Sequence, residues 1–352
     1  MAELTQAWPR PSKPRPIVFI GAGGIVRTAH IPAYRRLNYP IAGLFDVNDA
    51  NAQQTAKDFE VPVVFASLAE AAAVENAVFD LAVPGDQIAG ILEHLPDGAP
   101  VLMQKPMGRD LAEARRILEI CEARRMPAAV NLQLRFSPAM LALRVMLERG
   151  DFGTLTDIDL RLVIEQPWHF WTFMIDAPRL ELVYHSIHYL DAIRLLAGDP
   201  RGAYCKAVGH PDTPQLRDTR SSIILDYGDQ LRCSLVMNHT HRQGPRHKMS
   251  ELTVEGTKGA ARLVLGVNLE YPTGSPDEME VAFGKEWSRV PLRGSWFTEA
   301  FEGPMSNLQR FIAGEDDRLV SPVQDTIRTM ALIEACYESS DRGGMPIPAL
   351  RS

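Results

Sequence analysis

The first half of this chain is organised around the stretch Ile17-Val-Phe-Ile-Gly21-Ala-Gly23-Gly24-Ile-Val26. Four apolar residues, typical of a buried strand, lead directly into a glycine cluster. Gly21 permits a tight turn, and Gly23 lets the backbone approach a pyrophosphate at the amino end of the following helix. A dinucleotide-binding βαβ unit begins in this way. We therefore expect Gly21, Ala22, Gly23, Gly24 and Ile25 to contact a dinucleotide.

A second apolar run, residues 41–45, ends at Asp46. A carboxylate at this strand end accepts a hydrogen bond from an adenosine ribose 2′-OH and repels a 2′-phosphate. No arginine directly follows Asp46, so we expect NAD as the cofactor, with NADP as a possible alternative. The third position of the glycine motif holds Val26 in place of Gly or Ala, which widens the helix–strand packing slightly but leaves the phosphate turn intact. The alternative is a tight turn without a ligand.

The composition describes an ordinary globular chain. Its 352 residues are 45% hydrophobic and 23% charged, and the length favours two domains. The net charge of −7 argues against a nucleic-acid surface. Four well-separated cysteines predict reduced thiols and a cytoplasmic location. No apolar run is long enough for a membrane helix, and the proline-rich residues 1–14 predict a flexible arm in place of a signal peptide.

Between residues 15 and 135, short apolar segments alternate with helical ones. The expected strands are residues 17–20, 41–45, 61–65, 78–83, 101–103 and 128–132. The expected helices include residues 50–58, 68–74, 86–95 and 111–125, the last capped by Asp110 with Glu113 three residues later. This alternation predicts an α/β Rossmann domain, a doubly wound parallel sheet with helices on both faces.

Ligands bind such sheets beyond the carboxyl ends of the strands. Two strand ends are therefore candidates: Pro84 after the fourth strand, and Gln104-Lys105-Pro106 after the fifth. A lysine at that place lies beside the nicotinamide half of a bound dinucleotide, and Pro106 restricts its backbone. The alternative is a solvated surface lysine, because most lysines are exposed. We expect Pro84, Gln104 and Lys105 to contact the cofactor.

The second half, residues 136–352, has a different pattern. A connecting helix over 137–149 precedes strands that alternate polar and apolar residues, with hairpin turns at 227–230 and 256–259. These features predict an α/β domain with a large, open, mostly antiparallel sheet. Its uncovered face predicts a homodimer or homotetramer through that sheet. Two C-terminal helices, about 298–313 and 322–340, could pack back on the first domain.

The helix expected over residues 179–197 carries the candidate chemistry. Glu181, Tyr184, His185, His188 and Asp191 share one face, with apolar residues opposite. A dehydrogenase without a metal needs a base for the hydroxyl proton, which suits His188. It also needs a cation for the developing alkoxide, which suits Lys105. A helix with a wet polar face is the alternative.

Two further clusters are candidates. Trp168-His169-Phe170-Trp171 offers aromatic faces for the C–H faces of a sugar or cyclitol, although core packing or an interface would explain it equally. His239 and His241, followed by His247, could suggest a metal. No cysteine or carboxylate partner lies nearby in the sequence, so we expect no metal there, but a substrate-rim or surface role.

Taken together, these residues resemble the Gfo/Idh/MocA family (glucose–fructose oxidoreductase, inositol dehydrogenase, rhizopine catabolism). The motifs are Gly21-Ala-Gly23-Gly24 with His30-Ile-Pro32, Gln104-Lys105-Pro106, and His188-Tyr-Leu-Asp191 followed by Gly198. The resemblance covers nearly the whole chain. It implies a Rossmann domain, a C-terminal α/β domain with an open sheet, and NAD(P)-dependent oxidation or reduction of a sugar, cyclitol or related polyol.

By this resemblance, Lys105 matches the lysine of the family's Glu-Lys-Pro motif and His188 its catalytic histidine. Gln104 replaces the usual glutamate, and Tyr184 stands where most members have an aspartate. We hypothesise that Tyr184 orients His188 or shares its proton, with its pKa lowered by Lys105. The expected substrate contacts are Lys105, Trp168, His169, Tyr184, His185 and His188. Some members are ligand-sensing regulators without turnover, and this remains the alternative function.

Overall fold

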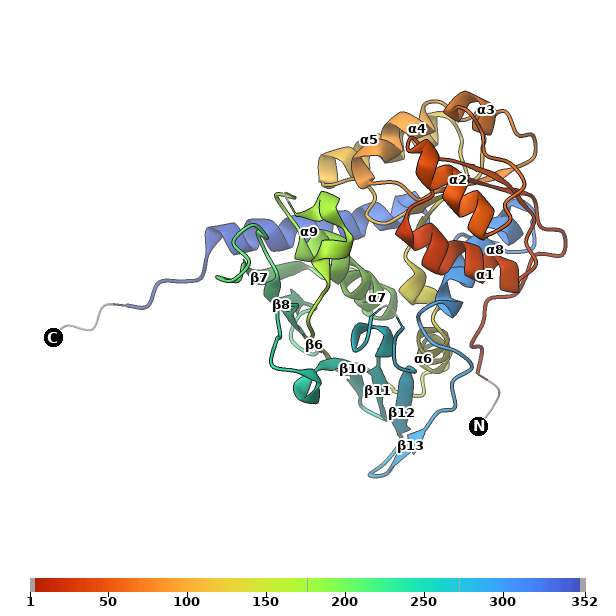
Figure 1. Ribbon diagram of the computed structural model, residues 1–352. Helices are drawn as coiled ribbons and strands as arrows, with labels where there is room; N and C mark the ends of the chain where they lie inside the picture. Colours follow the sequence, from red (N-terminus) through yellow and green to blue (C-terminus); the bar gives the residue numbers. More distant parts are fainter. Residues whose placement is uncertain (1–3, 176, 272, 349–352) are drawn as a thin grey trace.

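The computed structural model describes residues 4–175, 177–271 and 273–348, so the outer ends of the expected arm and of the second domain lie outside the described residues. Figure 1 shows two parts. The helices α1–α5 surround the first sheet, and the larger second sheet spreads below them. The long helix α9 (Val323–Arg342) runs between the two parts and contacts both α5 (Leu111–Ala123) and β7 (Gly202–Val208).

The first sheet is parallel throughout, with strand order β2-β1-β3-β4-β5. The strands are β1 (Ile17–Ile20), β2 (Ile41–Phe45), β3 (Val78–Leu81), β4 (Val101–Gln104) and β5 (Ala128–Asn131). All but β2 are completely buried, as expected for strands covered on both faces. The predicted Rossmann sheet is confirmed.

One expected strand of this domain was wrong. Residues 61–65 form no strand, and Val64 makes only an isolated bridge to Leu44 of β2. Pro62 lacks the N–H that a regular ladder needs, which explains why the pairing does not extend. The helices here are α1 (Ile31–Arg36), after a π turn at Val26–His30, α2 (Asp49–Asp58), α3 (Leu68–Ala72), α4 (Gly85–Leu92) and α5.

The second sheet has eight strands in the order β13-β12-β11-β10-β6-β9-β8-β7. All neighbours are antiparallel except β6 and β9, which are parallel. The strands after β7 are β8 (Arg220–Asp226), β9 (Arg232–Asn238), β10 (Met249–Gly256), β11 (Ala260–Val264), β12 (Glu278–Ala282) and β13 (Trp287–Arg289); β6 is Leu155–Val163. The open, mostly antiparallel sheet is confirmed, with both predicted hairpins, β8–β9 and β10–β11.

Alternation along these strands separates a buried face from an open one. Ile158, Leu160 and Leu162 of β6 are buried, and so are Leu252 and Val254 of β10. The opposite face carries exposed large apolar side chains: Tyr204 on β7, Ile224 on β8 and Val236 on β9. The sheet therefore packs one face into the molecule and leaves the other uncovered.

The remaining helices tie the two halves together. They are α6 (Pro138–Glu148), α7 (Ile187–Ala197), α8 (Glu302–Ile312) and α9. Helix α8 contacts β4 and β5, and α9 contacts β5 and α5, so both C-terminal helices lie against the first domain. Residues 4–14 do not form the expected flexible arm. The Trp8 indole donates to Asp316 (2.7 Å) and packs on Phe136, which holds this segment against the protein.

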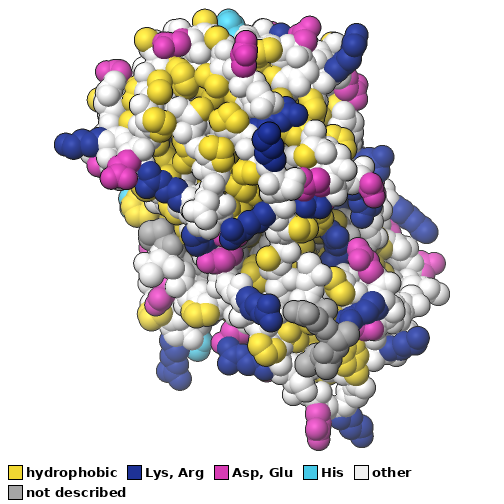
Figure 2. Space-filling model, turned by 90° about the vertical axis from the view of Figure 1, so that its right-hand side faces the viewer, with side chains coloured by type: hydrophobic (Ala, Val, Ile, Leu, Met, Phe, Trp, Pro, Cys, Tyr) yellow, Lys and Arg dark blue, Asp and Glu magenta, His cyan; other side chains and the backbone are white. Residues whose placement is uncertain are grey.

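The surface and the cysteines bear on the expected environment. Lys and Arg are mixed with Asp and Glu over the face seen in Figure 2, which shows no field of a single sign. Cys121, Cys205, Cys233 and Cys336 are free and buried. Across the part of the chain that the structure describes, no helix combines the length and apolarity needed to cross a membrane. The cytoplasmic location stays a prediction.

Candidate active site

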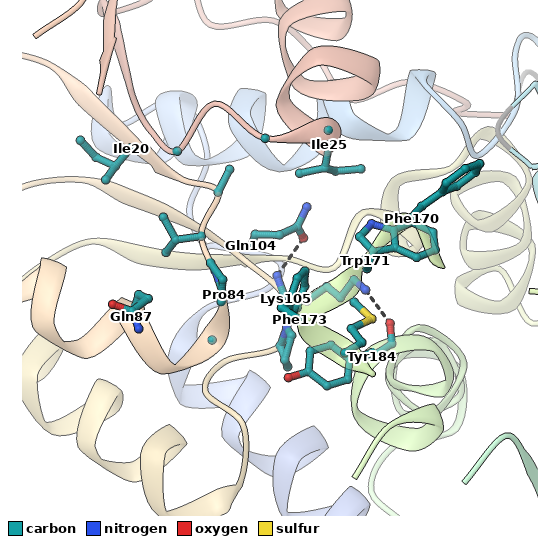
Figure 3. A pocket seen from close by; sticks show the side chains of 18 of the residues that line it. Ile20, Ile25, Pro84, Gln87, Gln104, Lys105, Phe170, Trp171, Phe173 and Tyr184 are labelled. Atoms are coloured by element: carbon teal, nitrogen blue, oxygen red, sulfur yellow. Dashed lines mark hydrogen bonds between the residues drawn. The ribbon is translucent and has the colours of Figure 1, made fainter. Parts of the chain in front are cut away.

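A cavity of about 890 Å³ extends from the glycine turn after β1 to the helix α7 of the second domain. It brings together most of the residues that the sequence singled out. They are Gly21, Gly23, Gly24, Ile25, Asp46, Pro84, Gln104, Lys105, Trp168, Tyr184, His185 and His188. Figure 3 shows Lys105 in this cavity, between the strand ends of the first domain and Tyr184 of the second.

The glycine turn forms one end of the cavity. Gly21 has φ +105°, and a Cβ there would lie 2.4 Å from the carbonyl oxygen of Ala82, so only glycine fits. A Cβ on Gly23 or Gly24 would meet nothing within 4 Å, although both residues line the cavity. The backbone thus borders open space where a pyrophosphate could approach it, which fits a dinucleotide.

Asp46 is held beside this turn. Its Oδ2 accepts from the N–H of Ala22 (2.7 Å), and its Oδ1 accepts from the N–H of Asn48 (2.8 Å). These bonds fix the carboxylate at the end of β2, where a ribose hydroxyl could reach it. Ala22 itself is buried and does not line the cavity, so its expected contact with the cofactor is replaced by this support of Asp46.

Gln104 connects Lys105 to a buried polar cluster under the sheet. Its Oε1 accepts from the N–H of Lys105 (2.8 Å), and its Nε2 lies 3.2 Å from Nε2 of His30. The other ring nitrogen of His30 lies 2.8 Å from the Asp80 carboxylate, which also accepts from Tyr34. An amide suits this position because it accepts from the backbone and donates to the imidazole with one side chain.

Lys105 reaches across the cavity to the second domain. Its Nζ donates to the backbone carbonyl of Tyr184 (2.6 Å), as the dashed line in Figure 3 shows. Burial lowers the pKa of Lys105 to about 8. The ammonium group is therefore fixed in place and can release its proton close to neutral pH.

The helix of the second domain differs from a regular α-helix with a wet face. A π turn (Leu182–Ser186) precedes α7, and Glu181, His188 and Asp191 are all buried. Asp191 does not serve His188, because both its oxygens bind Arg135 at 2.6 Å. The predicted polar face is therefore divided between separate partners inside the protein.

His188 faces the cavity in a neutral form. Only 5% of its surface is exposed, its ring packs on Trp296 at 5.1 Å, and its buried Nδ1 has no hydrogen-bond partner in the described structure. Burial and the charge of Lys105 lower its pKa well below the ordinary 6.5. A neutral imidazole beside an ammonium group can accept a proton from a bound alcohol.

A second histidine, His185, lies next to His188 and contacts a third, buried histidine, His239. Nδ1 of His185 lies 2.8 Å from Nε2 of His239, whose Nδ1 is 3.8 Å from the buried carboxyl of Glu181. Burial lowers the pKa of His239 to about 3 and raises the pKa of Glu181 to about 8. His239 thus has neither a rim nor a surface role, but lies behind His185.

Both domains that form this site match known proteins. Residues 15–132 match the model of an oxidoreductase family with an NAD-binding Rossmann fold. Residues 144–348 match the C-terminal alpha/beta domain of the same family. The chain belongs to the Gfo/Idh/MocA family. Its first domain is accordingly an NAD(P)-binding Rossmann domain.

Relatives of this Gfo/Idh/MocA protein are dehydrogenases. It is 25% identical to D-apiose dehydrogenase of Paraburkholderia graminis, over 92% of this chain and 87% of the relative. It is 28% identical to trans-1,2-dihydrobenzene-1,2-diol dehydrogenase of Bos taurus, over 70% and 71%. An oxidoreductase from Agrobacterium radiobacter, solved with NAD+, L-tartaric acid and magnesium, shares the fold, with a TM-score of 0.80, 18% identity and coverage of 94% and 98%.

The pKa of Tyr184 in this Gfo/Idh/MocA protein is shifted in the direction opposite to the expected one. Burial, followed by the Asp86 carboxylate, raises the pKa of the Tyr184 phenol. Lys105 binds the backbone carbonyl of this residue, while its ring packs against Phe173 at 6.1 Å. Tyr184 therefore contributes its carbonyl oxygen to the site, which any residue at this position could supply.

Replacing Tyr184 by Phe should accordingly change kcat/KM by no more than about threefold and leave its pH profile unchanged. The substitution keeps both the carbonyl that Lys105 binds and the ring. Steady-state kinetics across the pH range would measure this. A displaced limb in the profile, or a loss of tenfold or more, would restore the phenol to the chemistry.

The aromatic segment after β6 was only partly predicted. Trp168 is buried and lines the cavity. His169 is exposed and lies outside the lining, and its ring is tilted against that of Phe170, with 4.4 Å between the ring centres. Four further aromatic residues line the cavity without any sequence pattern that predicts them: Phe173, Tyr271, Trp296 and Phe297. Within the described ranges, no three His, Cys, Asp or Glu side chains are grouped so that they could hold a metal.

Proposed function

We propose that the protein is an NAD(P)-dependent dehydrogenase acting on the carbinol of a sugar, cyclitol or related polyol. One observation carries the proposal: Lys105 of the first domain and His188 of the second line the same cavity as the glycine turn. In this scheme residues 15–135 hold the cofactor, and residues 136–352 supply the substrate side and the contact between copies.

The residues divide the chemistry between them. The Lys105 ammonium group lies where it can stabilise the negative charge that develops on the carbinol oxygen. Neutral His188 takes the hydroxyl proton, because its low pKa keeps it unprotonated at neutral pH. The glycine turn, Ile25, Asp46, Pro84 and Gln104 would hold the dinucleotide. When bound, NAD(P) supplies the acceptor for the hydride that leaves the carbinol carbon.

Turnover assays test this proposal directly. Purified protein is incubated with NAD+ and a panel of sugars, inositols and cyclic diols, and the absorbance of NADH is followed. Reduction of NAD+ with at least one alcohol supports a dehydrogenase. Binding of NAD+ and of a panel member without any turnover would indicate the ligand-sensing regulator instead.

The cofactor preference can be tested at Asp46. We propose NAD over NADP because this carboxylate would repel a 2′-phosphate, and because nearby Arg27 is paired with Asp58. Asp46→Ser should lower kcat/KM for NAD+ and raise it for NADP+, changing their ratio by about tenfold or more. Asp49→Ser, an exposed position on α2, is the control. An unchanged ratio in Asp46→Ser would contradict the role of the carboxylate.

We also propose that a second copy of the chain covers the open face of the second sheet. Tyr204 pairs with Ile224 across β7 and β8, and exposed Val236 lies on the adjacent β9. Arg262 pairs with Glu251 and Glu280 on the same sheet, a row of alternating charge suited to a two-fold contact. Tyr204→Glu with Val236→Lys should convert a dimer or tetramer into monomers in sedimentation velocity. A monomeric wild-type protein would contradict the proposal.

A further inference from the structure

Aromatic side chains enclose the end of the cavity that contains Lys105 and His188. They come from three segments far apart in the sequence: the loop after β6, the loop around residue 271 and the loop before α8. We call them the aromatic wall: Trp168, Phe170, Trp171, Phe173, Tyr271, Trp296 and Phe297. The ring centres of Trp171 and Tyr271 lie 5.5 Å apart, and those of Tyr271 and Phe297 lie 6.1 Å apart. Figure 3 shows Trp171 beside Lys105, with Phe170 farther out.

This end of the cavity is short of charged groups. Of all lining residues that the structure describes, only Asp46 and Lys105 are charged side chains other than histidine, and Asp46 lies at the glycine turn. The aromatic end therefore has no carboxylate and no arginine in the described lining. Besides Gln87 and Gln104, the side-chain amides of the described lining are Gln133, Gln166 and Asn268, and the Asn268 nitrogen already donates to Tyr189 and Ser250.

A free sugar or cyclitol fits such a wall poorly. Its ring carries hydroxyl groups all around, and each enclosed hydroxyl that finds no partner costs about tenfold or more in affinity. An apolar ring gains affinity from the same surroundings, because it removes aromatic surface from water. Phe170 and Phe173 are 56% and 51% exposed at the cavity, and an apolar body would cover them.

His185 can bind one further hydroxyl group of a ligand. Its Nδ1 is occupied by His239, so Nε2 is the ring nitrogen left for a ligand, and His185 lines the cavity. The rings of His185 and His188 lie 6.5 Å apart, centre to centre. Two hydroxyls on adjacent carbons could therefore each meet one imidazole.

We propose that the substrate is a cyclic vicinal diol with an otherwise apolar ring, alicyclic or fused to an arene. This narrows the proposed function and rests on it. The hydroxyl to be oxidised meets Lys105 and His188, the neighbouring hydroxyl binds His185, and the rest of the ring packs on the aromatic wall.

Matched substrates test the proposal. With NAD+, trans-1,2-dihydroxytetralin should give a kcat/KM about 100-fold above that of myo-inositol or D-xylose. Its kcat/KM should also be about tenfold above that of 1-tetralol, which lacks the second hydroxyl. His185→Phe should abolish the preference for the diol over 1-tetralol, while His169→Phe, outside the cavity, should retain it. Equal or better use of inositol or xylose would overturn the proposal and leave the dehydrogenase function standing.

Binding separates this inference from turnover. Three of the five tryptophans line the cavity, so ligand binding can be followed by quenching of their fluorescence. Trans-1,2-dihydroxytetralin should bind at least about tenfold more tightly than myo-inositol. Trp171→Asn should weaken the binding of the diol more than the binding of myo-inositol. Tight diol binding without any turnover would refute the dehydrogenase function alone. Diol binding no tighter than that of inositol would refute the substrate class.

Discussion

Replacing Lys105 by Met should lower kcat about 10²–10³-fold while changing the dissociation constant of NADH by no more than about threefold. The methionine keeps the unbranched apolar part of the side chain but removes the charged amino group that faces the carbinol oxygen. The bond to the Tyr184 carbonyl is also lost, although the Gln104 bond to the backbone N–H remains. Single-turnover kinetics and NADH fluorescence would measure the two quantities separately.

The pH profile gives a second measure of Lys105. Because burial lowers its pKa to about 8, kcat/KM should fall as the pH rises through about 8. Lys105→Met should lack this alkaline limb. Lys57→Met, on the exposed face of α2, is the matched control and should behave like the wild type. A Lys105 variant that retains full turnover would remove the ammonium group from the mechanism.

Lys105 should also lower the stability of the protein. The folded pKa lies below that of the unfolded chain, so the unfolded state holds the proton more tightly between about pH 8 and 10.5. The wild type should therefore gain stability as the pH rises through this window, and below it the cost of burial is fully present. Lys105→Met should be no less stable than the wild type at neutral pH, as measured by thermal unfolding.

The sequence predicted those parts of the molecule that depend on local pattern. The glycine stretch, the buried strands and the lysine at a strand end follow from chain order, because ligands collect at the carboxyl ends of parallel strands. The strand β12 and the two edge strands β7 and β13 were not predicted. All three residues of β13 are exposed, so no alternation marks it.

The expected side-chain directions around residue 184 were wrong for one physical reason. In the π turn at Leu182–Ser186, hydrogen bonds run from residue i to i+5, so a projection at 100° per residue fails there. The sequence therefore placed the Tyr184 phenol beside His188, whereas the bond to Lys105 is made by the Tyr184 carbonyl oxygen. His239 and the aromatic wall come from segments joined only by the tertiary fold, and no periodicity in the sequence brings them together.

Replacing His188 by Asn should lower kcat about 10²–10⁴-fold, because the amide keeps a polar side chain but cannot accept the hydroxyl proton. Binding of the cofactor should persist, since the glycine turn and Asp46 are unaffected. His247→Asn, at an exposed position, is the control. Partial rescue of the variant by added imidazole would identify the missing group as a base, whereas a variant with full activity would refute the assignment.

The acid side of the profile follows from the same burial. His185, His188 and His239 all have pKa values lowered by burial, so they stay neutral in the folded protein where the unfolded chain binds protons. The free energy of unfolding should therefore fall as the pH drops below 6.5, while the wild-type kcat/KM stays level until well below that pH. His188→Asn removes one of these three sites, so its unfolding should depend less steeply on pH in this range. An identical slope for variant and wild type would show that His188 is not held neutral by the fold, and the proposed base would then lack its physical reason.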